Sequence, residues 1–387
     1  MKRPQITGLY YITHVDNVPS ILKYGILSHE RIISDNIQYT PIYDEGIVEK
    51  RQHIETPEGE PLWHYANLYF QPRNPMLYRV LCEKNVREIA IISVRPEILD
   101  RLDIYIANGN AARHESEIMP AGKGLKETPQ IVKDTIVEYW NEEDGSKRKI
   151  MAECLVPNMV SPDLIYCIYV ANHDVKKNLE PFVLPGVSIV PDPHMYFLPS
   201  YRRILTDNLF LAEGDLFFSH MQTLTISVNT VGVMGKGLAS RARYQFPRAY
   251  VYYEDLCRSG KLKMGRPRIY KRELPLEREL ADEPESLSNQ NLGKWFLLFP
   301  TKRHWKERAD IVGIEEGLRW LSNSYKKEGI ESLAIPALGC GLGRLEWRDV
   351  GPLMCQYLRA FDIPVAIYLP AEKKISSEFL SKDFLLP

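Results

Sequence analysis

The chain has 387 residues, of which 44% are apolar and 26% charged, and this composition excludes a disordered chain. The length is too great for one ordinary hydrophobic core and suits two domains. The net charge of −1 hides a difference between the halves. Residues 1–200 carry 21 Lys and Arg against 27 Asp and Glu, and residues 201–387 carry 28 against 23. Charge alone therefore does not nominate the first half as a nucleic-acid binder, although a local basic patch could serve there.

Targeting and metal motifs do not stand out. The opening MKRPQITGLYYIT has no apolar core of a signal peptide, and no run of about 18 apolar residues could form a membrane helix. The six cysteines are scattered and form no C-x-x-C pair. We therefore expect a cytoplasmic protein with reduced thiols, no metal and no membrane association.

The first half is expected to be strand-rich α+β. A short apolar strand at 8–13 precedes a helix that opens near Asp16 or Asn17 and ends at Gly25. Residues 31–62 form a long polar loop, with a helix around 43–52, and are the natural candidate for a mobile lid. Further strands are predicted at 66–71, 87–95 and 163–171, and residues 102–120 as a strand that runs into a Gly/Asn turn.

A domain boundary is predicted near residue 200, because residues 190–206 hold three prolines and the pattern changes after them. The domains would be 1–200 and 201–387. In the second, strands alternate with helices, which indicates a layered α/β sheet with ligand loops at strand ends. The strands are expected at 223–228, 294–299, 331–336 and 364–369, and the helices at about 238–258, 310–328 and 347–360.

Two glycine-rich loops follow strands of the second half, NTVGVMGKGLA at 229–239 and PALGCGLG at 336–343. Glycine lets backbone N–H groups approach a phosphate closely, and helix N-termini add a positive dipole end. Two such loops suit a diphosphate. The alternative is that both are merely tight strand–helix turns.

Together with Gly214-Asp215-Leu216 and the GRLEW that ends the second loop, these loops resemble a macrodomain. The resemblance implies an α/β fold with a central mixed sheet flanked by helices, and ADP-ribose as the ligand. Asp215 would receive the adenine amino group, the loop with Asn229 would embrace the distal ribose, and the second loop would hold the diphosphate. The ligand-binding residues implied are Asp215, Asn229, Gly235, Gly237, Gly339, Cys340, Gly341, Leu342 and Gly343.

The segment FPTKRHW at 299–305 is similar to the macrodomain of the DarG antitoxins, which remove ADP-ribose from DNA thymidine. That resemblance implies that Lys302 is catalytic. On its own, Lys302 is either a surface cation in a basic turn or, if burial lowers its pKa, a nucleophile or an acid/base.

In the first half, several isolated polar residues stand in strand-rich surroundings. Glu153 is the most notable, because IMAECLVP flanks a carboxylate with apolar residues, and burial of a carboxylate is costly unless it is paired or used. The others have plain structural alternatives, such as a hydrogen-bonded structural histidine or a solvent-exposed arginine. They are Thr13, His14, Arg51 and His114.

In order along the chain, these residues and their surroundings resemble the DarT toxins, which ADP-ribosylate thymidine in single-stranded DNA. The matching segments are LYYITHVDNVPSIL at 9–22, VEKR at 48–51, NLYFQPRNPMLY at 67–78, GNAA at 109–112 and AECLVP at 152–157. The resemblance implies an α+β ADP-ribosyltransferase (ART/PARP-like) domain with NAD as its substrate.

The resemblance also assigns roles. Glu153 would be the catalytic glutamate and Arg51 the essential arginine, which also binds NAD. Thr13 and His14 would begin the nicotinamide pocket, and His114 would lie near a supporting histidine, although the residues after Ala112 diverge. Either Arg51 or Glu153 could assist removal of the thymine proton.

A base must leave the stack to be reached, so aromatic and basic residues near the site are candidate contacts to DNA. We expect these to be Tyr69, Arg73 and Arg79. Tyr69 and Phe70 face opposite sides of a strand, so at least one of the two belongs to the core.

The leading hypothesis is a fused toxin–antitoxin that writes and erases ADP-ribose on DNA. Its partners would be single-stranded DNA, NAD and ADP-ribosylated DNA, and its oppositely charged halves would favour an intramolecular domain contact. Two alternatives stay open at this point. The macrodomain could be a non-catalytic reader of ADP-ribose, or the acceptor could be RNA or protein.

Overall fold

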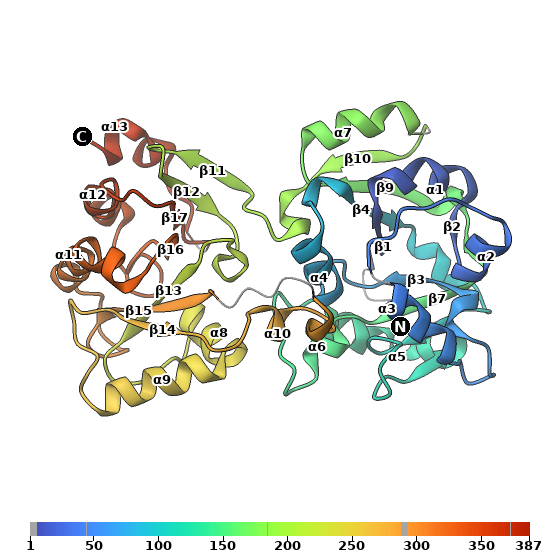
Figure 1. The fold of residues 1–387 in the computed structure, drawn as a ribbon, viewed down its shortest axis with the longest axis horizontal. Coiled ribbons are helices and arrows are strands. Elements are labelled where there is room, and N and C mark those ends of the chain that lie inside the picture. Colours follow the sequence, from blue (N-terminus) through green and yellow to red (C-terminus); the bar gives the residue numbers. More distant parts are fainter. Residues whose placement is uncertain (1–5, 44, 184, 288–292, 372) are drawn as a thin grey trace. The chain divides into compact units, whose positions relative to one another are not determined.

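In the computed structural model, residues 6–43, 45–183, 185–287, 293–371 and 373–387 are described. Two units make up the chain (Figure 1): Met1–Tyr196 with Leu280–Asn289, and Phe197–Glu279 with Gln290–Pro387. The first division falls near the predicted residue 200. The prediction of two consecutive domains did not anticipate that Leu280–Asn289 joins the first unit.

The first unit is built on an eight-stranded mixed sheet in the order β10-β9-β4-β1-β3-β7-β5-β6. A separate two-stranded sheet pairs β2 Ile26–Leu27 with β8 Met159–Val160. The strands of the large sheet are β1 Leu9–His14, β3 Tyr65–Tyr69, β4 Ile89–Val94, β5 Tyr105–Ala107, β6 Ile118–Pro120, β7 Glu153–Pro157, β9 Ile165–Val170 and β10 Ser188–Pro191.

The apolar runs of the sequence become the central strands of this sheet. All six residues of β4 are buried, as a strand covered on both faces requires. The predicted strands at 8–13, 66–71, 87–95 and 163–171 correspond to β1, β3, β4 and β9. The first helix ends as predicted at Gly25, whose φ of 89° favours glycine.

Seven α-helices of the first unit are described: α1 Val18–Tyr24, α2 His29–Ser34, α3 Glu45–Lys50, α4 Pro75–Glu83, α5 Ala121–Thr135, α6 Ser146–Lys149 and α7 His173–Leu179. The longest, α5, was not predicted, because its two glycines and Pro129 obscure a helical pattern. Its buried residues nevertheless follow helical spacing: Ala121, Gly124, Thr128, Ile131 and Thr135.

The second unit has a seven-stranded sheet in the order β11-β12-β17-β16-β13-β15-β14. The pairs from β12 to β15 are parallel, and β11 and β14 are antiparallel at the edges. The expected mixed α/β sheet is confirmed. Its strands are β11 Tyr201–Ile204, β12 Leu209–Glu213, β13 Thr223–Asn229, β14 Arg268–Lys271, β15 Trp295–Lys302, β16 Leu333–Pro336 and β17 Val365–Tyr368.

Helices cover both faces of this sheet. Phe296 and Phe299 are three apart in β15 and therefore face opposite sides. The Phe296 ring lies 4.8 Å from the ring of Phe246 at the junction of two helices. Phe299 lies against Gly317 of a third helix, where an added Cβ would come within 2.5 Å of the ring. The helices are α8 Gly237–Gln245, α9 Pro247–Arg258, α10 Glu277–Leu280, α11 Ile311–Glu328, α12 Trp347–Leu358 and α13 Lys382–Leu385.

The single helix predicted at 238–258 is wrong: it is two helices. Phe246 leaves helical geometry with φ −131° and ψ 65°, and Pro247 begins α9. Proline lacks an N–H and suits the first position of a helix, so the chain stops and restarts there. Among the described residues, no helix has the length and apolar character needed to cross a membrane.

Close packing of α5 on β5 offers a stability test. A Cβ at Gly124 would lie 2.7 Å from Ile106 Cβ, whereas a Cβ at Gly122, in the same helix, meets nothing within 4 Å. We expect Gly124→Ala to lower the free energy of unfolding of the first unit by about 1–3 kcal/mol through overpacking. Gly122→Ala should raise it by about 0.5–1 kcal/mol, because alanine is the better helix former.

Calorimetric unfolding of the two variants measures this difference. Equal shifts of the transition in the same direction would contradict the packing argument.

Candidate active sites

The carboxylate of Glu153 is fully buried within the first sheet. Glu153 is the first residue of β7 and lies between Tyr69 of β3 and Ala107 of β5. Arg51 Nη2 donates to Oε2 at 2.8 Å, Arg51 Nη1 to Oε1 at 3.4 Å, and the backbone N–H of Ala111 to Oε1 at 2.9 Å. These donors offset the cost of burying a charge.

Arg51 begins a 3-10 helix, Arg51–His53, directly after α3. Burial disfavours its charge, but the adjacent Glu153 carboxylate outweighs burial and raises the pKa of Arg51. Arg51 therefore keeps its positive charge and is poorly suited to take up a proton.

Neutral phenols surround this ion pair. Burial, followed by the charge of Glu153, raises the pKa of Tyr69 well above its usual value. Burial likewise raises the pKa of Tyr43, and raises that of Tyr11 to about 12. The hydroxyl groups thus stay protonated at physiological pH.

A cavity of about 370 Å³ opens beside Arg51, and its size is typical of small-molecule sites. Glu153 is not among the lining residues, so Arg51 covers the carboxylate from the cavity side. Much of one wall comes from the polar stretch 31–62, which was predicted to be a lid.

Asn17 holds this wall in place. Its side chain accepts from Thr40 N at 2.8 Å and donates to Thr40 O at 2.8 Å and to Thr13 Oγ1 at 3.1 Å. We predicted only a capping role for Asn17, yet it makes no side-chain cap bond. The partner lies 23 residues away, so no local pattern could have indicated this tether.

The residues predicted to bind NAD do not all reach the cavity. Thr13 and Arg51 line it. His14 does not; its Nδ1 accepts from Asp16 N at 3.1 Å and caps a short helix. His114 is 92% exposed beside Glu115 and does not line the cavity either.

Of the three residues predicted to contact DNA, two line the cavity and one does not. Tyr69 and Arg79 line the cavity and are buried. Arg73 does not line it, and its Nη1 lies 3.0 Å from His194 Nε2.

In the second unit, Asn229 ends β13 and shapes the first glycine loop. Its Oδ1 accepts from the N–H groups of Val231 at 3.0 Å and Val233 at 3.3 Å and from the Tyr253 hydroxyl at 2.9 Å. Its Nδ2 donates to Val233 O at 2.6 Å. The amide is therefore engaged within the protein, and Asn229 orients the loop.

Lys302 lies where the two glycine loops meet. It ends β15, pairs in register with Asn229, and donates from Nζ to Leu342 O of the second loop at 3.3 Å. Burial, followed by the nearby charge of Arg344, lowers the pKa of Lys302. An amine in this setting loses its proton more readily than an exposed lysine.

The glycines of the loops fall into two groups. A Cβ at Gly343 would lie 2.5 Å from Gly339 O, and Gly339 has a φ of 74°, so both are needed to close the second loop. Gly235 and Gly341 are instead exposed: an added Cβ would meet nothing within 4 Å at Gly341 and only Val233 Cγ1, at 3.8 Å, at Gly235. At the start of α8, Gly237 approaches the Leu342 side chain, where a Cβ would lie 3.2 Å from Cδ1.

The two remaining predicted ligand residues already have protein partners. Asp215 Oδ1 accepts from Phe217 N at 3.0 Å, and Oδ2 pairs with Arg241, which the sequence did not single out. Cys340 is buried, and burial raises the pKa of its thiol to about 12, so Cys340 can contribute backbone but not thiolate. Among the described residues, no group of three or more His, Cys, Asp and Glu side chains is placed to hold a metal ion.

Two family descriptions match the chain: "ssDNA thymidine ADP-ribosyltransferase, DarT" over residues 10–197, and "Macro domain" over residues 288–354. A DNA ADP-ribosyl transferase–DNA ADP-ribosyl glycohydrolase fusion protein of Thermosipho africanus is 55% identical over 385 residues, 99% of each chain. The solved structure of Thermosipho africanus DarTG in complex with ADP-ribose has a TM-score of 0.94 at 53% identity, and the match covers 98% of this chain and 100% of that one. A DNA ADP-ribosyl glycohydrolase of Thermus aquaticus is 34% identical over 165 residues, 42% of each chain.

The buried ion pair predicts strong coupling between its partners. We expect Arg51→Ala to lower the free energy of unfolding by about 3 kcal/mol, because it leaves a buried carboxylate without its counter-ion. The double variant with Glu153→Ala should lose about 2 kcal/mol less than the sum of the single variants.

Urea denaturation of the four chains gives the coupling energy. The exposed pair of Arg31 in α2 and Asp35 directly after this helix is the matched control, and its coupling should be much weaker. Equal couplings for the two pairs would show that burial of Glu153 is not what makes Arg51 matter.

Proposed function

This chain belongs to the family of fused DNA ADP-ribosyl transferases and DNA ADP-ribosyl glycohydrolases, and we propose that Glu153 and Arg51 form its transferase centre and Lys302 its glycohydrolase centre. The first unit attaches ADP-ribose to thymidine in single-stranded DNA, and the second removes ADP-ribose from DNA. The observation that carries the assignment is the Arg51–Glu153 pair at the wall of the first unit's cavity.

NAD supplies the ADP-ribosyl group in this proposal, and Arg51 at the cavity wall is the donor that we assign to its diphosphate. Arg51 presents a two-pronged donor that fits phosphate as well as carboxylate. When Arg51 turns to the diphosphate, Glu153 is released to accept a hydrogen bond from the ribose. Its carboxylate then stabilises the positive charge that develops at the anomeric carbon as the bond to nicotinamide breaks.

The thymine ring nitrogen forms the new bond to that carbon and loses its proton. We assign the role of proton acceptor to Glu153, because the raised pKa of Arg51 makes the guanidinium an unsuitable base. Nicotinamide leaves as a neutral molecule, so charge and protons balance.

In the second unit, the accessible backbone at Gly235 and Gly341 would hold the ADP-ribose, with Asp215 at its adenine end. Lys302 lies between the two loops. Its unprotonated amine can attack the anomeric carbon, so that the bond to the thymine nitrogen breaks, the thymine regains a proton, and water then releases ADP-ribose from the lysine. Alternatively, the amine can accept a proton from a ribose hydroxyl. The lowered pKa favours the unprotonated form. The non-catalytic reader and the RNA or protein acceptor are the less favoured alternatives, because the relatives are described as acting on DNA and as hydrolases.

The proposal includes a cytoplasmic location. In the part of the chain that the structure describes, none of the six cysteines forms a disulfide, as is usual in a reducing compartment.

The purified chain, incubated with NAD and mixed single-stranded oligonucleotides, tests the assignment when the DNA mass is followed over time. The Lys302→Ala form should accumulate an ADP-ribose adduct on thymidine, and the intact chain should show little. Adding Glu153→Gln to Lys302→Ala should abolish the adduct, since a neutral amide cannot stabilise the developing charge.

If no form modifies DNA, the transferase assignment is wrong. If the intact chain and Lys302→Ala accumulate equal adduct, Lys302 is not the residue that removes it.

Lys302 also predicts a pH dependence. Arg344→Gln removes a like charge and so raises the pKa of Lys302, which moves the rising limb of the rate of ADP-ribose removal to higher pH. We expect a shift of about half a pH unit, as for a partly solvated charge pair. Arg344→Lys keeps the charge and should leave the limb in place. A limb that does not move in Arg344→Gln would mean that Lys302 does not titrate in the reaction.

A further inference from the structure

The segment 280–287 packs within the first unit, although β14 before it and β15 after it in sequence belong to the second. Leu280 and Ala281 are fully buried. Trp140 Nε1 donates to Leu280 O at 3.0 Å, and Asp282 N donates to Pro75 O at 3.1 Å. The segment is therefore seated by apolar burial and backbone hydrogen bonds.

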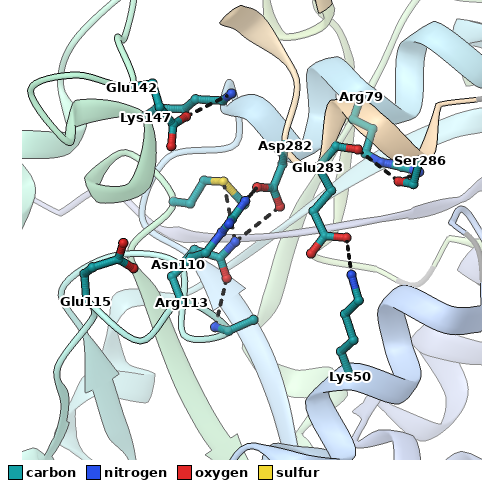
Figure 2. Close-up of polar contacts among 12 residues, drawn as sticks. Lys50, Arg79, Asn110, Arg113, Glu115, Glu142, Lys147, Asp282, Glu283 and Ser286 are labelled. Carbon is teal, nitrogen blue, oxygen red and sulfur yellow. Dashed lines mark hydrogen bonds and ion pairs between the residues drawn. The ribbon is translucent and has the colours of Figure 1, made fainter. Parts of the chain in front are cut away.

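Two acidic side chains of this segment, Asp282 and Glu283, line the transferase cavity, and Figure 2 shows their polar contacts. Asp282 Oδ2 accepts from Asn110 Nδ2 at 3.2 Å, and Asp282 Oδ1 pairs with Arg113 at 3.4 Å. Glu283 Oε2 pairs with Lys50 Nζ at 2.9 Å. Further along, Arg79 Nη2 donates to Ser286 Oγ at 2.9 Å.

The groups that the segment engages adjoin the groups that hold Glu153. Lys50 directly precedes Arg51, and Asn110 directly precedes Ala111. Arg51 and Ala111 are the donors to the Glu153 carboxylate. One short segment thus bridges both sides of the reacting centre.

The backbone of the segment is held in an unfavourable conformation. Glu283 has φ 44° and ψ 57°, a left-handed geometry uncommon for a residue other than glycine, and Pro284 follows it. Such geometry persists where surrounding contacts determine it, and it gathers at functional sites. The conformational preference of a glutamate backbone therefore does not explain why Glu283 points toward Lys50.

We propose that segment 280–287 is a built-in competitor for phosphate at the transferase site, a proposal that rests on the function proposed above. Its two carboxylates take the ammonium, guanidinium and amide groups of Lys50, Arg113 and Asn110, which are suited to bind phosphate. The phosphate belongs either to the diphosphate of NAD or to the backbone of the DNA acceptor.

The competition follows from charge. Carboxylate and phosphate are recognised by the same cationic donors, and a second anion beside Asp282 and Glu283 is repelled. The pairs are partly exposed: the side chains of Lys50 and Arg113 are 62% and 44% exposed, and those of Glu283 and Asp282 are 22% and 15% exposed. Exposed pairs are weak, so the segment restrains the site in a graded manner and can be displaced by substrate.

The test uses the full chain in the Lys302→Ala background, so that adducts persist. Asp282→Asn with Glu283→Gln removes both charges and keeps the side-chain size. At subsaturating substrate, we expect the initial rate of DNA modification to rise about fivefold, as the loss of two weak ion pairs implies. Glu285→Gln is the matched control: Glu285 is exposed and makes no hydrogen bond or ion pair with the residues that the structure describes. Its rate should not change.

The KM for NAD and the KM for the oligonucleotide are measured separately in the double variant. Only the KM of the substrate whose phosphate competes with the segment should fall. Binding of NAD and of a labelled oligonucleotide, each measured alone, keeps the test independent of transfer. Tighter binding without any DNA modification would sink the proposed function and leave the competitor in place. Unchanged binding and rates, or a lower rate because the segment completes the site, would overturn the inference.

Thermal unfolding confirms that each variant is folded. If the double variant unfolds, the single Glu283→Gln replaces it, because it removes only the surface contact with Lys50. It should then show a smaller change of the same sign, and no change would again overturn the inference.

Discussion

The ion pair between Arg51 and Glu153 is the constraint on which the first unit depends. The sheet places a carboxylate at the start of β7 with no exposure to water, and such a charge must be paired. Its partners come from two other segments: Arg51 from the polar stretch after α3, and Ala111 N from the turn after β5. Satisfying one buried charge therefore fixes two irregular segments against the sheet, and these segments form the walls of the cavity.

The same pair sets a condition on the chemistry. While Arg51 holds Glu153, the carboxylate faces the guanidinium and not the cavity. In the proposed mechanism, the arginine gains another anionic partner before the glutamate turns to a ribose, which couples release of Glu153 to arrival of a diphosphate. In the second unit, the proposed anion contact is of another kind. It would use the exposed backbone of the glycine loops at Gly235 and Gly341 in place of a buried charged side chain.

Sequence reasoning succeeded where the signal was local. Apolar runs predicted the central strands β1, β3, β4 and β9, and a carboxylate among apolar residues drew attention to Glu153, which is fully buried. It failed where partners are distant. Arg51 and Glu153 were nominated separately, but their contact spans 102 residues, and Asp282 meets Asn110 across 172. The run ELADEPESL at 279–287 has the composition of a surface loop. Nothing in the run predicts that Leu280 and Ala281 are buried within the first unit. Helix α5 was missed because the glycine that lets it approach β5 also weakens its helical pattern.

Because the two activities belong to one chain, weak contacts are sufficient to hold segment 280–287 at the transferase site. Two separate proteins would need an extensive interface to keep an acidic segment at the transferase site, because association costs translational and rotational freedom. Within one chain the segment is always present at high effective concentration, so a buried Leu280 and a few exposed ion pairs can hold it. The segment lies in sequence between β14 and β15, and β15 ends in Lys302. On the proposed assignments, the stretch of chain that carries Lys302 thus also carries the competing carboxylates, and neither can be separated from the transferase by dilution.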